Sequence, residues 1–356
     1  MKFVSSLFRI FPPPAVLRFL HCGVSVSDEG VHYVVLKPKG DTNEVVSWGF
    51  IPLPPDAVKA GIIERPDAVT TALSKVSSTT ATRYCAATIP DEKAYIFKTS
   101  VQPVAGSQVP DLVALKIQEM VPIAAPNALF DYTVVKRDAE GVHVVVRVAH
   151  QKVSEAYFKV FKTSGLMPLL FKIESQALAD ACISSDEAPS ILMKMSDSRT
   201  LFAIVAHGAV YFSTSIDFGM SRIVDHVSKT LNIGADQVQK VLFGGETTKQ
   251  FSHEQVMFSL TNGISVIRDE VIKLQDYWKS RGDDEADIGR VYMSGSLDGA
   301  AGIEKYLSDS FGLKVEVANV WRSACDVGEY IPPIEHKEAS AYGSAIGVAL
   351  PHSLHW

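Results

Sequence analysis

Residues 191–216 read ILMKMSDSRTLFAIVAHGAVYFSTSI, three β-like runs separated by two short turns. Residues 19–50, FLHCGVSVSDEGVHYVVLKPKGDTNEVVSWGF, contain the same succession of runs and turns. The expected strands are Phe19–Val26, Val31–Lys37 and Glu44–Phe50 in the first copy, and Ile191–Met195, Thr200–Ala206 and Ala209–Ile216 in the second. The copies begin about 170 residues apart, and such a repeat predicts two related lobes that face a cleft.

Each copy is followed by further helices and strands. A helix at Pro66–Val76 and a strand at Tyr84–Ile89 follow the first copy. A helix at Met220–Leu231, a mainly helical stretch, a strand–helix–strand unit and a small-residue helix at Ala339–Leu350 follow the second. Between the copies, residues 95–173 read as strand–helix–strand–strand and then helix–strand, which predicts a compact α+β insert in the first lobe.

The composition is typical of a folded chain with more than one lobe. Of the 356 residues, 47% are hydrophobic and 21% are charged, and the formal net charge is −6. Lysine and arginine form no basic stripe, so nucleic acid is not expected as a partner. The four cysteines form no CxxC pair and the ten histidines form no HExxH motif, so we expect no metal site.

The sequence also predicts where the protein works. No apolar run reaches the ~18 residues that a membrane span needs, so a cytoplasmic location is expected. Residues 1–14 have the spacing of a short amphipathic segment, with four apolar residues on one face and two basic residues off it, namely Phe3, Leu7, Ile10 and Phe11, and Lys2 and Arg9. This segment is either a surface anchor that binds a membrane or a partner, or a terminal tail that packs on its own domain.

Several stretches beyond the repeat are similar to known proteins. They are residues 109–122 (VPDLVALKIQEMVP), 164–168 (SGLMP), 174–178 (ESQAL) and 267–277 (IRDEVIKLQDY). Together with the order of the elements, they resemble the actin-like ATPases of the FtsA and PilM type, and are closer to the PilM family of type IV pilus assembly. The resemblance covers about residues 15 to 350. It implies an α/β actin-like (ribonuclease H-like) two-lobe fold with a strand–helix–strand–strand insert.

The resemblance also implies domain boundaries. Residues 1–14 are the amphipathic segment, residues 15–92 and 174–188 form subdomain 1A, and residues 93–173 form the insert, subdomain 1C. Residues 189–234 and 286–350 form subdomain 2A, and residues 235–285 form the helical subdomain 2B.

The family's nucleotide-binding turns have lost their acids in this chain. The first turn reads Gly-x-Asp-x-Gly/Ser in the family, whereas here Gly23 is followed by Ser25 at the acid position and by Ser27. The second reads Asp-x-Gly, whereas here Lys194 replaces the acid and Ser196 the glycine. Without a carboxylate beside each turn, the usual magnesium ligands are missing. Lys194 either neutralises a phosphate or pairs with an acid of the protein.

Further positions equivalent to the family's nucleotide site follow along the chain. Ser198 follows the second turn, Lys240 matches a position near the nucleoside, and Ser294 and Gly295 stand in the third turn, where the family has Thr/Ser-Gly-Gly. The resemblance therefore predicts a degenerate nucleotide site and a protein that does not hydrolyse ATP. No cofactor is firmly predicted, and ATP binding stays open.

The resemblance further implies a scaffold of the type IV pilus, or of a related DNA-uptake machine, on the cytoplasmic face of the inner membrane. Such a scaffold links the pilus motor ATPase and platform proteins to a PilN-like membrane protein, whose N-terminal cytoplasmic peptide lies between the first lobe and the insert. Leu112, Leu115 and Leu169 are the candidates for that groove. The alternatives are an FtsA-like membrane-associated filament protein, or an ATP-binding member of the same fold such as a kinase.

Overall fold

The computed structural model describes residues 20–40, 42–102, 108–244, 251–280, 286–326 and 328–351. The first five-stranded sheet has the order β10-β6-β1-β2-β3, formed by β1 (Cys22–Val26), β2 (Gly30–Lys39), β3 (Thr42–Pro52), β6 (Tyr84–Ile89) and β10 (Met167–Ile173). The second has the order β13-β12-β11-β14-β15, formed by β11 (Ser190–Met195), β12 (Thr200–Ala206), β13 (Ala209–Ile216), β14 (Arg290–Gly295) and β15 (Lys314–Val317).

The two sheets share one topology. In each, the first strand of the meander pairs antiparallel with the second and parallel with the strand that follows the helices. Cys22 of β1 thus lies opposite Val35 of β2 and Cys85 of β6. The internal repeat predicted from the two meanders is confirmed.

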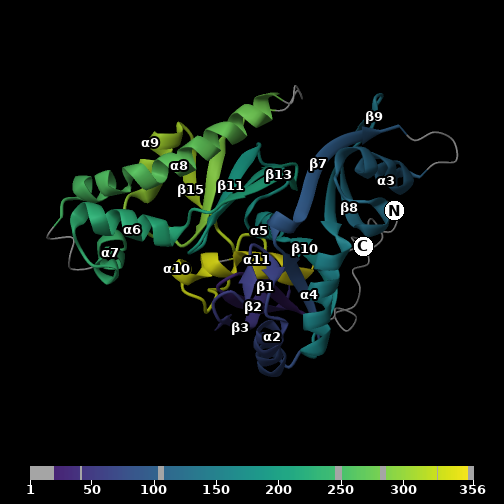
Figure 1. The fold of residues 1–356 in the computed structure, drawn as a ribbon, viewed down its shortest axis with the longest axis horizontal. Coiled ribbons are helices and arrows are strands. Elements are labelled where there is room, and N and C mark those ends of the chain that lie inside the picture. Colours follow the sequence, from purple (N-terminus) through teal and green to yellow (C-terminus); the bar gives the residue numbers. More distant parts are fainter. Residues whose placement is uncertain are drawn as a thin grey trace.

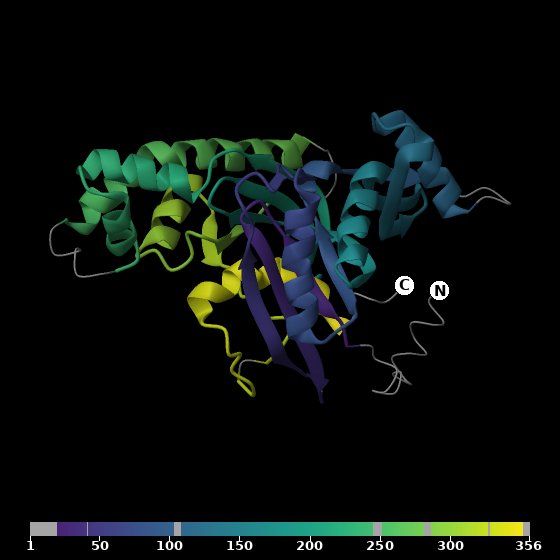
Figure 2. The same cartoon turned by 60° about the horizontal axis from the view of Figure 1, so that its bottom comes forward.

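Helices fill three layers around the two sheets (Figures 1 and 2). Between the sheets lie α5 (Glu174–Cys182) and α11 (Gly343–Ala349). The outer face of the first sheet is covered by α2 (Pro66–Thr80) and α4 (Gln151–Thr163). The outer face of the second is covered by α6 (Met220–Leu231), α7 (Ala235–Leu242), α8 (His253–Ser280) and α9 (Ile303–Phe311).

Burial follows from this layering. All five residues of β1 are buried, as expected for a central strand with helices on both faces. On the outer side, α4 presents Tyr157, Val160 and Phe161, spaced three and four residues apart, to the first sheet. Gly165 follows this helix with a φ of +90°, a backbone conformation that glycine adopts without steric cost.

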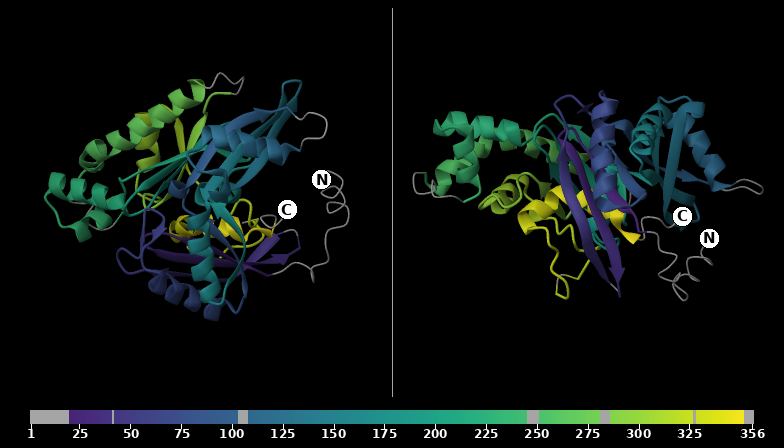
Figure 3. Two further views of the ribbon diagram at one scale, coloured as in Figure 1. Left: turned by 45° about the vertical axis from the view of Figure 1, so that its right-hand side comes forward. Right: turned by 90° about the horizontal axis from the view of Figure 1, so that it is seen from below.

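The insert consists of β7 (Ala94–Val101), α3 (Val109–Met120), β8 (Ala128–Asp138) and β9 (Gly141–His150), with the sheet order β7-β9-β8. Val113 and Ile117 of α3 pack on one face of this sheet. The other face lies against β13 of the second sheet, where Val145 enters the core of the second lobe. Figure 3 shows the insert projecting beside both lobes. The α/β two-lobe fold with an α+β insert is therefore confirmed.

Shorter elements complete the described chain: β4 (Val58–Lys59), β5 (Ile62–Ile63), η2 (Asp91–Lys93), η3 (Ala125–Asn127), α10 (His336–Ala339) and η5 (Ser340–Tyr342). The sequence pattern predicted no helix at residues 174–182, which form α5. This helix is covered on several sides and carries no apolar stripe for a periodicity search to find, since even Ser175 and Gln176 are buried.

Two further expectations concern the ends and the boundaries. The amphipathic segment 1–14 lies outside the described residues. Within the part of the chain that is described, no helix combines the length and the apolar character needed to cross a membrane. The domain boundaries stay a prediction.

Candidate functional site

Two equivalent turns lie at the ends of β1 and β11, where they face each other across the gap between the lobes. In the first, the Ser27 N–H donates to the Gly30 carbonyl at 2.9 Å, and the Gly30 N–H donates to the Ser27 hydroxyl at 3.3 Å. In the second, the Ser196 N–H donates to the Arg199 carbonyl at 2.9 Å, and the Arg199 N–H donates to the Ser196 hydroxyl at 3.3 Å. The repeat thus extends to individual hydrogen bonds, and each turn needs its first serine.

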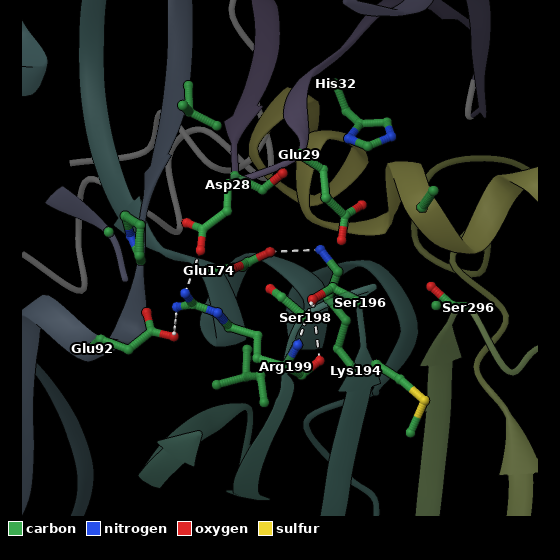
Figure 4. A pocket seen from close by; sticks show the side chains of 18 residues that line it. Asp28, Glu29, His32, Glu92, Glu174, Lys194, Ser196, Ser198, Arg199 and Ser296 are labelled. Atoms are coloured by element: carbon green, nitrogen blue, oxygen red, sulfur yellow. Dashed lines mark hydrogen bonds and ion pairs between the residues drawn. The ribbon is translucent and has the colours of Figure 1, made fainter. Parts of the chain in front are cut away.

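These two turns bind each other (Figure 4). The Arg199 guanidinium donates to Asp28 of the first turn and, at 2.6 Å, to Glu92 of η2. The Asp197 N–H donates to Glu29 at 2.6 Å. The second turn therefore holds three carboxylates of the first lobe.

Lys194 has a partner inside the protein. Its ammonium group donates to Glu174 at 2.5 Å and to the Ser344 hydroxyl at 3.1 Å, and its side chain is only 14% exposed. Glu174 begins α5, and Ser344 belongs to α11, so both partners come from the layer between the sheets. Of the two roles that the sequence left open for Lys194, the structure has the pairing with an acid.

The cavity between the turns is small and acidic. Its volume is about 170 Å³, below the ~300–1,000 Å³ of usual ligand pockets. Its charged lining comprises four carboxylates and two cations, namely Asp28, Glu29, Glu92 and Glu174, and Lys194 and Arg199. Both cations are already paired with carboxylates. The described lining therefore offers a polyphosphate no free cation.

Two titratable groups of this lining are shifted towards their neutral forms. Burial raises the pKa of the Asp28 carboxyl, and the neighbouring Arg199 guanidinium opposes that rise. Burial, with the positive charge of Lys194 nearby, lowers the pKa of His32 to about 3. The His32 ring packs against Phe50 and Tyr342, with ring centroids 4.5 and 5.0 Å away, and is neutral at physiological pH.

The structure brings five of the sequence-predicted site residues together around this cavity: Ser27, Lys194, Ser196, Ser198 and Gly295. Gly295 has a φ of +99°, and a Cβ there would lie 2.0 Å from the Met195 carbonyl oxygen, so this close approach of two strands requires glycine.

The other four predicted residues lie elsewhere. Ser25 is buried and accepts a hydrogen bond from Thr88 at 3.1 Å. Ser294 is buried and donates to the Ser340 carbonyl at 3.2 Å. Lys240 is exposed on α7 and does not line the cavity.

Gly23 lies under α11 instead of lining the cavity. A Cβ at this position would meet the Ala345 carbonyl oxygen at 2.1 Å and the Ala349 side chain at 2.7 Å. Gly23 therefore lets the helix between the sheets approach β1 closely.

Sequence reasoning missed Glu29, Glu92, Glu174 and Arg199 as members of the site. A signal for Arg199 was present, since the two turns align as SDEG and SDSR. The basic residue of one turn could have been matched to the acids of the other.

The cleft residues, as arranged, do not fit a magnesium–nucleotide complex. The cavity is small, its cations are paired, and the acid positions beside the turns hold Ser25 and Lys194. Among the described residues, the one group of three potential metal ligands within 4.8 Å is Asp138, Glu140 and His143, in the exposed β8–β9 hairpin of the insert. That group is remote from the cleft in the fold.

The predicted groove residues lie on two separate elements, helix α3 of the insert and strand β10 of the first sheet. Leu112 is half-buried against the core of the insert, and Leu115 is 57% exposed on the same helix, α3. Leu169 is the additional residue of a bulge in β10, between Pro168 and Leu170.

The family model of type IV pilus assembly protein PilM matches residues 23–353. The chain belongs to this family. Its fold is similar to that in the structure of a PilM-PilN type IV pilus biogenesis complex, with a TM-score of 0.72, 13% sequence identity, and coverage of 95% of this chain and 99% of the other. It is also similar to the ethanolamine utilization protein EutJ from Carboxydothermus hydrogenoformans, with a TM-score of 0.52, 14% identity, and coverage of 98% and 96%. No curated protein sequence matches the chain.

Membership in the PilM family accounts for the actin-like architecture described above. The match begins at Gly23 and ends past α11, so it includes both turns and the whole insert. In this PilM-family chain, contacts between the lobes cross the gap between the two turns.

Proposed function

We propose that this PilM-family chain is a non-hydrolysing scaffold of type IV pilus assembly that binds the N-terminal cytoplasmic peptide of a PilN-like membrane protein. The likeness to the PilM-PilN complex along nearly the whole chain is the observation that carries the proposal. The paired cations of the cleft support the absence of hydrolysis. Through this partner the chain sits at the cytoplasmic face of the inner membrane, where the motor ATPase and platform proteins are its further partners.

The free edge of β10 is the proposed peptide site. Among the described residues, β10 is the terminal strand of the first sheet and pairs on one side only, with β6. An extended peptide can add to such an edge through main-chain hydrogen bonds, while apolar side chains fix its register. Leu169, in the bulge of this strand, and Phe158 of α4, which is 40% exposed, supply apolar contacts. Leu115 supplies them from the insert.

Titration calorimetry with the N-terminal peptide of the neighbouring PilN-like protein tests this proposal, in the absence of nucleotide. We expect a Kd of about 1 μM or tighter, about −8 kcal/mol. Leu169→Asp and Leu115→Asp should each weaken binding about tenfold or more, because a desolvated carboxylate would replace an apolar contact. Phe258→Asp, on α8 of the second lobe and 72% exposed, is the matched control.

Circular dichroism must show that each variant is folded. If the wild-type chain gives no heat with the cognate peptide, the partner assignment is wrong. If the peptide binds and the two groove variants bind as tightly as Phe258→Asp, the partner is right and the position of its site is wrong.

A further inference from the structure

The charged contacts across the cleft join parts of the chain that are far apart in sequence. Arg199 is 171 residues from Asp28 and 107 residues from Glu92. Both acids belong to the first lobe, whereas Arg199 follows β11 of the second. A guanidinium presents several donors in a rigid fork, so one arginine can bind two carboxylates together.

We propose that Arg199, with Asp28 and Glu92, is an ionic latch that holds the two lobes closed over the cleft without a nucleotide. This role is separate from peptide binding, because the latch residues line the cleft and the proposed peptide site is the edge of β10. The latch joins the two turns through residues of the chain itself, where a phosphate ligand would otherwise join them. It predicts one closed arrangement of the lobes in the free protein.

The surroundings of the latch favour a strong contact. The side chains of Arg199, Asp28 and Glu92 are 17%, 24% and 20% exposed. Charge-assisted hydrogen bonds with limited access to water are stronger than exposed ion pairs and are screened less by salt. A second contact crosses the cleft beside the latch, from the Asp197 N–H to Glu29.

The latch also reaches the base of the insert. Glu92 lies in η2, directly before β7, and it accepts a further hydrogen bond from the Ser215 hydroxyl of β13 at 3.0 Å. Glu92 therefore links the first lobe, the root of the insert and the edge strand of the second sheet. Release of Arg199 removes one of the two contacts that hold Glu92 in this position.

Hydrogen–deuterium exchange of the full chain tests the latch. Arg199→Gln removes the charge and keeps most of the side-chain length. Arg268→Gln is the matched control, because the ion pair that Arg268 forms among the described residues lies within α8, with Asp269 at 3.2 Å. In Arg199→Gln we expect peptides with residues 27–30 and 196–200 to exchange about tenfold faster or more, since hydrogen bonds to charged groups stabilise the closed form by at least that factor. The Asp197 amide is the direct reporter, and β1 and β11 should stay protected.

Two results would overturn the latch. One is exchange at both turns no faster than in Arg268→Gln. The other is faster exchange throughout both sheets to the same degree, which indicates global loss of stability. Should Arg199→Gln fail to fold, Arg199→Lys decides the question. Lysine keeps the charge and loses the fork, so both turns should exchange faster than in the wild type and slower than a released latch, and unchanged exchange would reject the proposal.

Discussion

The turns Ser27–Gly30 and Ser196–Arg199 have the same internal hydrogen bonds, yet they differ at their fourth residue. Glycine in the first turn offers no side chain, whereas arginine in the second crosses the cleft to the first lobe. The serine that shapes each turn is therefore present whether or not the fourth residue reaches across the cleft. The comparison teaches that turns with the same backbone hydrogen bonds can differ in what they contact, because the side chain at the fourth position decides whether a turn reaches across the cleft.

The largest loss of stability is expected at Gly23, where β1 lies directly against α11 in the helix layer between the two sheets. Gly23→Ala places a Cβ against the main chain of α11, at 2.1 Å from the Ala345 oxygen. Because the main chain of α11 can move away only by disturbing its packing, the free energy of unfolding should fall by about 3 kcal/mol, as measured by urea titration. Gly289→Ala has no atom within 4 Å of the added Cβ and is the control, with a change below about 0.5 kcal/mol. Equal stability of the two variants would show that α11 can shift away from β1.

A second prediction contrasts Asp28, which has an arginine partner, with Asp91, which accepts from the Ser175 N–H at 2.8 Å and from the Ser175 hydroxyl. Burial raises the pKa of Asp91 to about 6, and the hydrogen bonds from Ser175 offset only part of that rise. The fold therefore favours the protonated carboxyl. The stabilisation that this raised pKa gives the folded state is complete below about pH 4 and is lost as the pH rises through about 6.

Asp91→Asn carries a permanently neutral group at this position. The free energy of unfolding of Asp91→Asn minus that of the wild type should therefore be larger at pH 7.5 than at pH 4.5, by about 2 kcal/mol. The variant thus gains stability relative to the wild type as the pH rises. Urea titrations of both proteins at the two pH values measure this difference. A relative stability that does not change with pH would mean that Asp91 is ionised in the fold throughout this range.

A smaller effect tests the equivalence of the two turns directly. Ser27→Ala and Ser196→Ala each remove a hydroxyl that accepts from the fourth residue of its own turn. Each should lower the free energy of unfolding by about 1 kcal/mol, and the two values should agree within about 0.5 kcal/mol. A markedly larger loss for Ser196→Ala would show that the second turn also depends on its serine to aim Arg199.

The fold followed from the sequence wherever local pattern and burial agree. The strands Tyr84–Ile89 and Thr200–Ala206 and the helix Met220–Leu231 have the bounds that the sequence predicts. The helix α5 was missed, because a helix covered on several sides shows no one-sided periodicity.

The candidate site was predictable in position and less so in its contacts. The repeat placed Ser27, Lys194 and Ser196 beside one cavity. It could not reveal that Arg199 binds acids more than 100 residues away, because pairing across a cleft depends on how the lobes are packed and leaves no local periodicity.

The smallest expected effect is the response to nucleotide, and it tests the proposal that the lobes are held closed without a ligand. A ligand that binds only the folded state raises stability by RT ln(1 + [L]/Kd), so even weak binding becomes visible when the ligand is in excess. Here Lys194 and Arg199 would have to leave Glu174, Asp28 and Glu92 before meeting a phosphate, and four carboxylates would repel it. We therefore expect millimolar Mg-ATP to leave the melting temperature of the wild-type chain unchanged and phosphate release to stay at background.

The variant Arg199→Gln separates two explanations for such an absence of response. If nucleotide stabilises this variant and not the wild type, the latch alone excludes the ligand, whereas no response in either protein means that the lost acid positions at Ser25 and Lys194 exclude it as well. A clear rise in melting temperature of the wild type, with phosphate release, would contradict both explanations and show that the cleft binds and hydrolyses ATP.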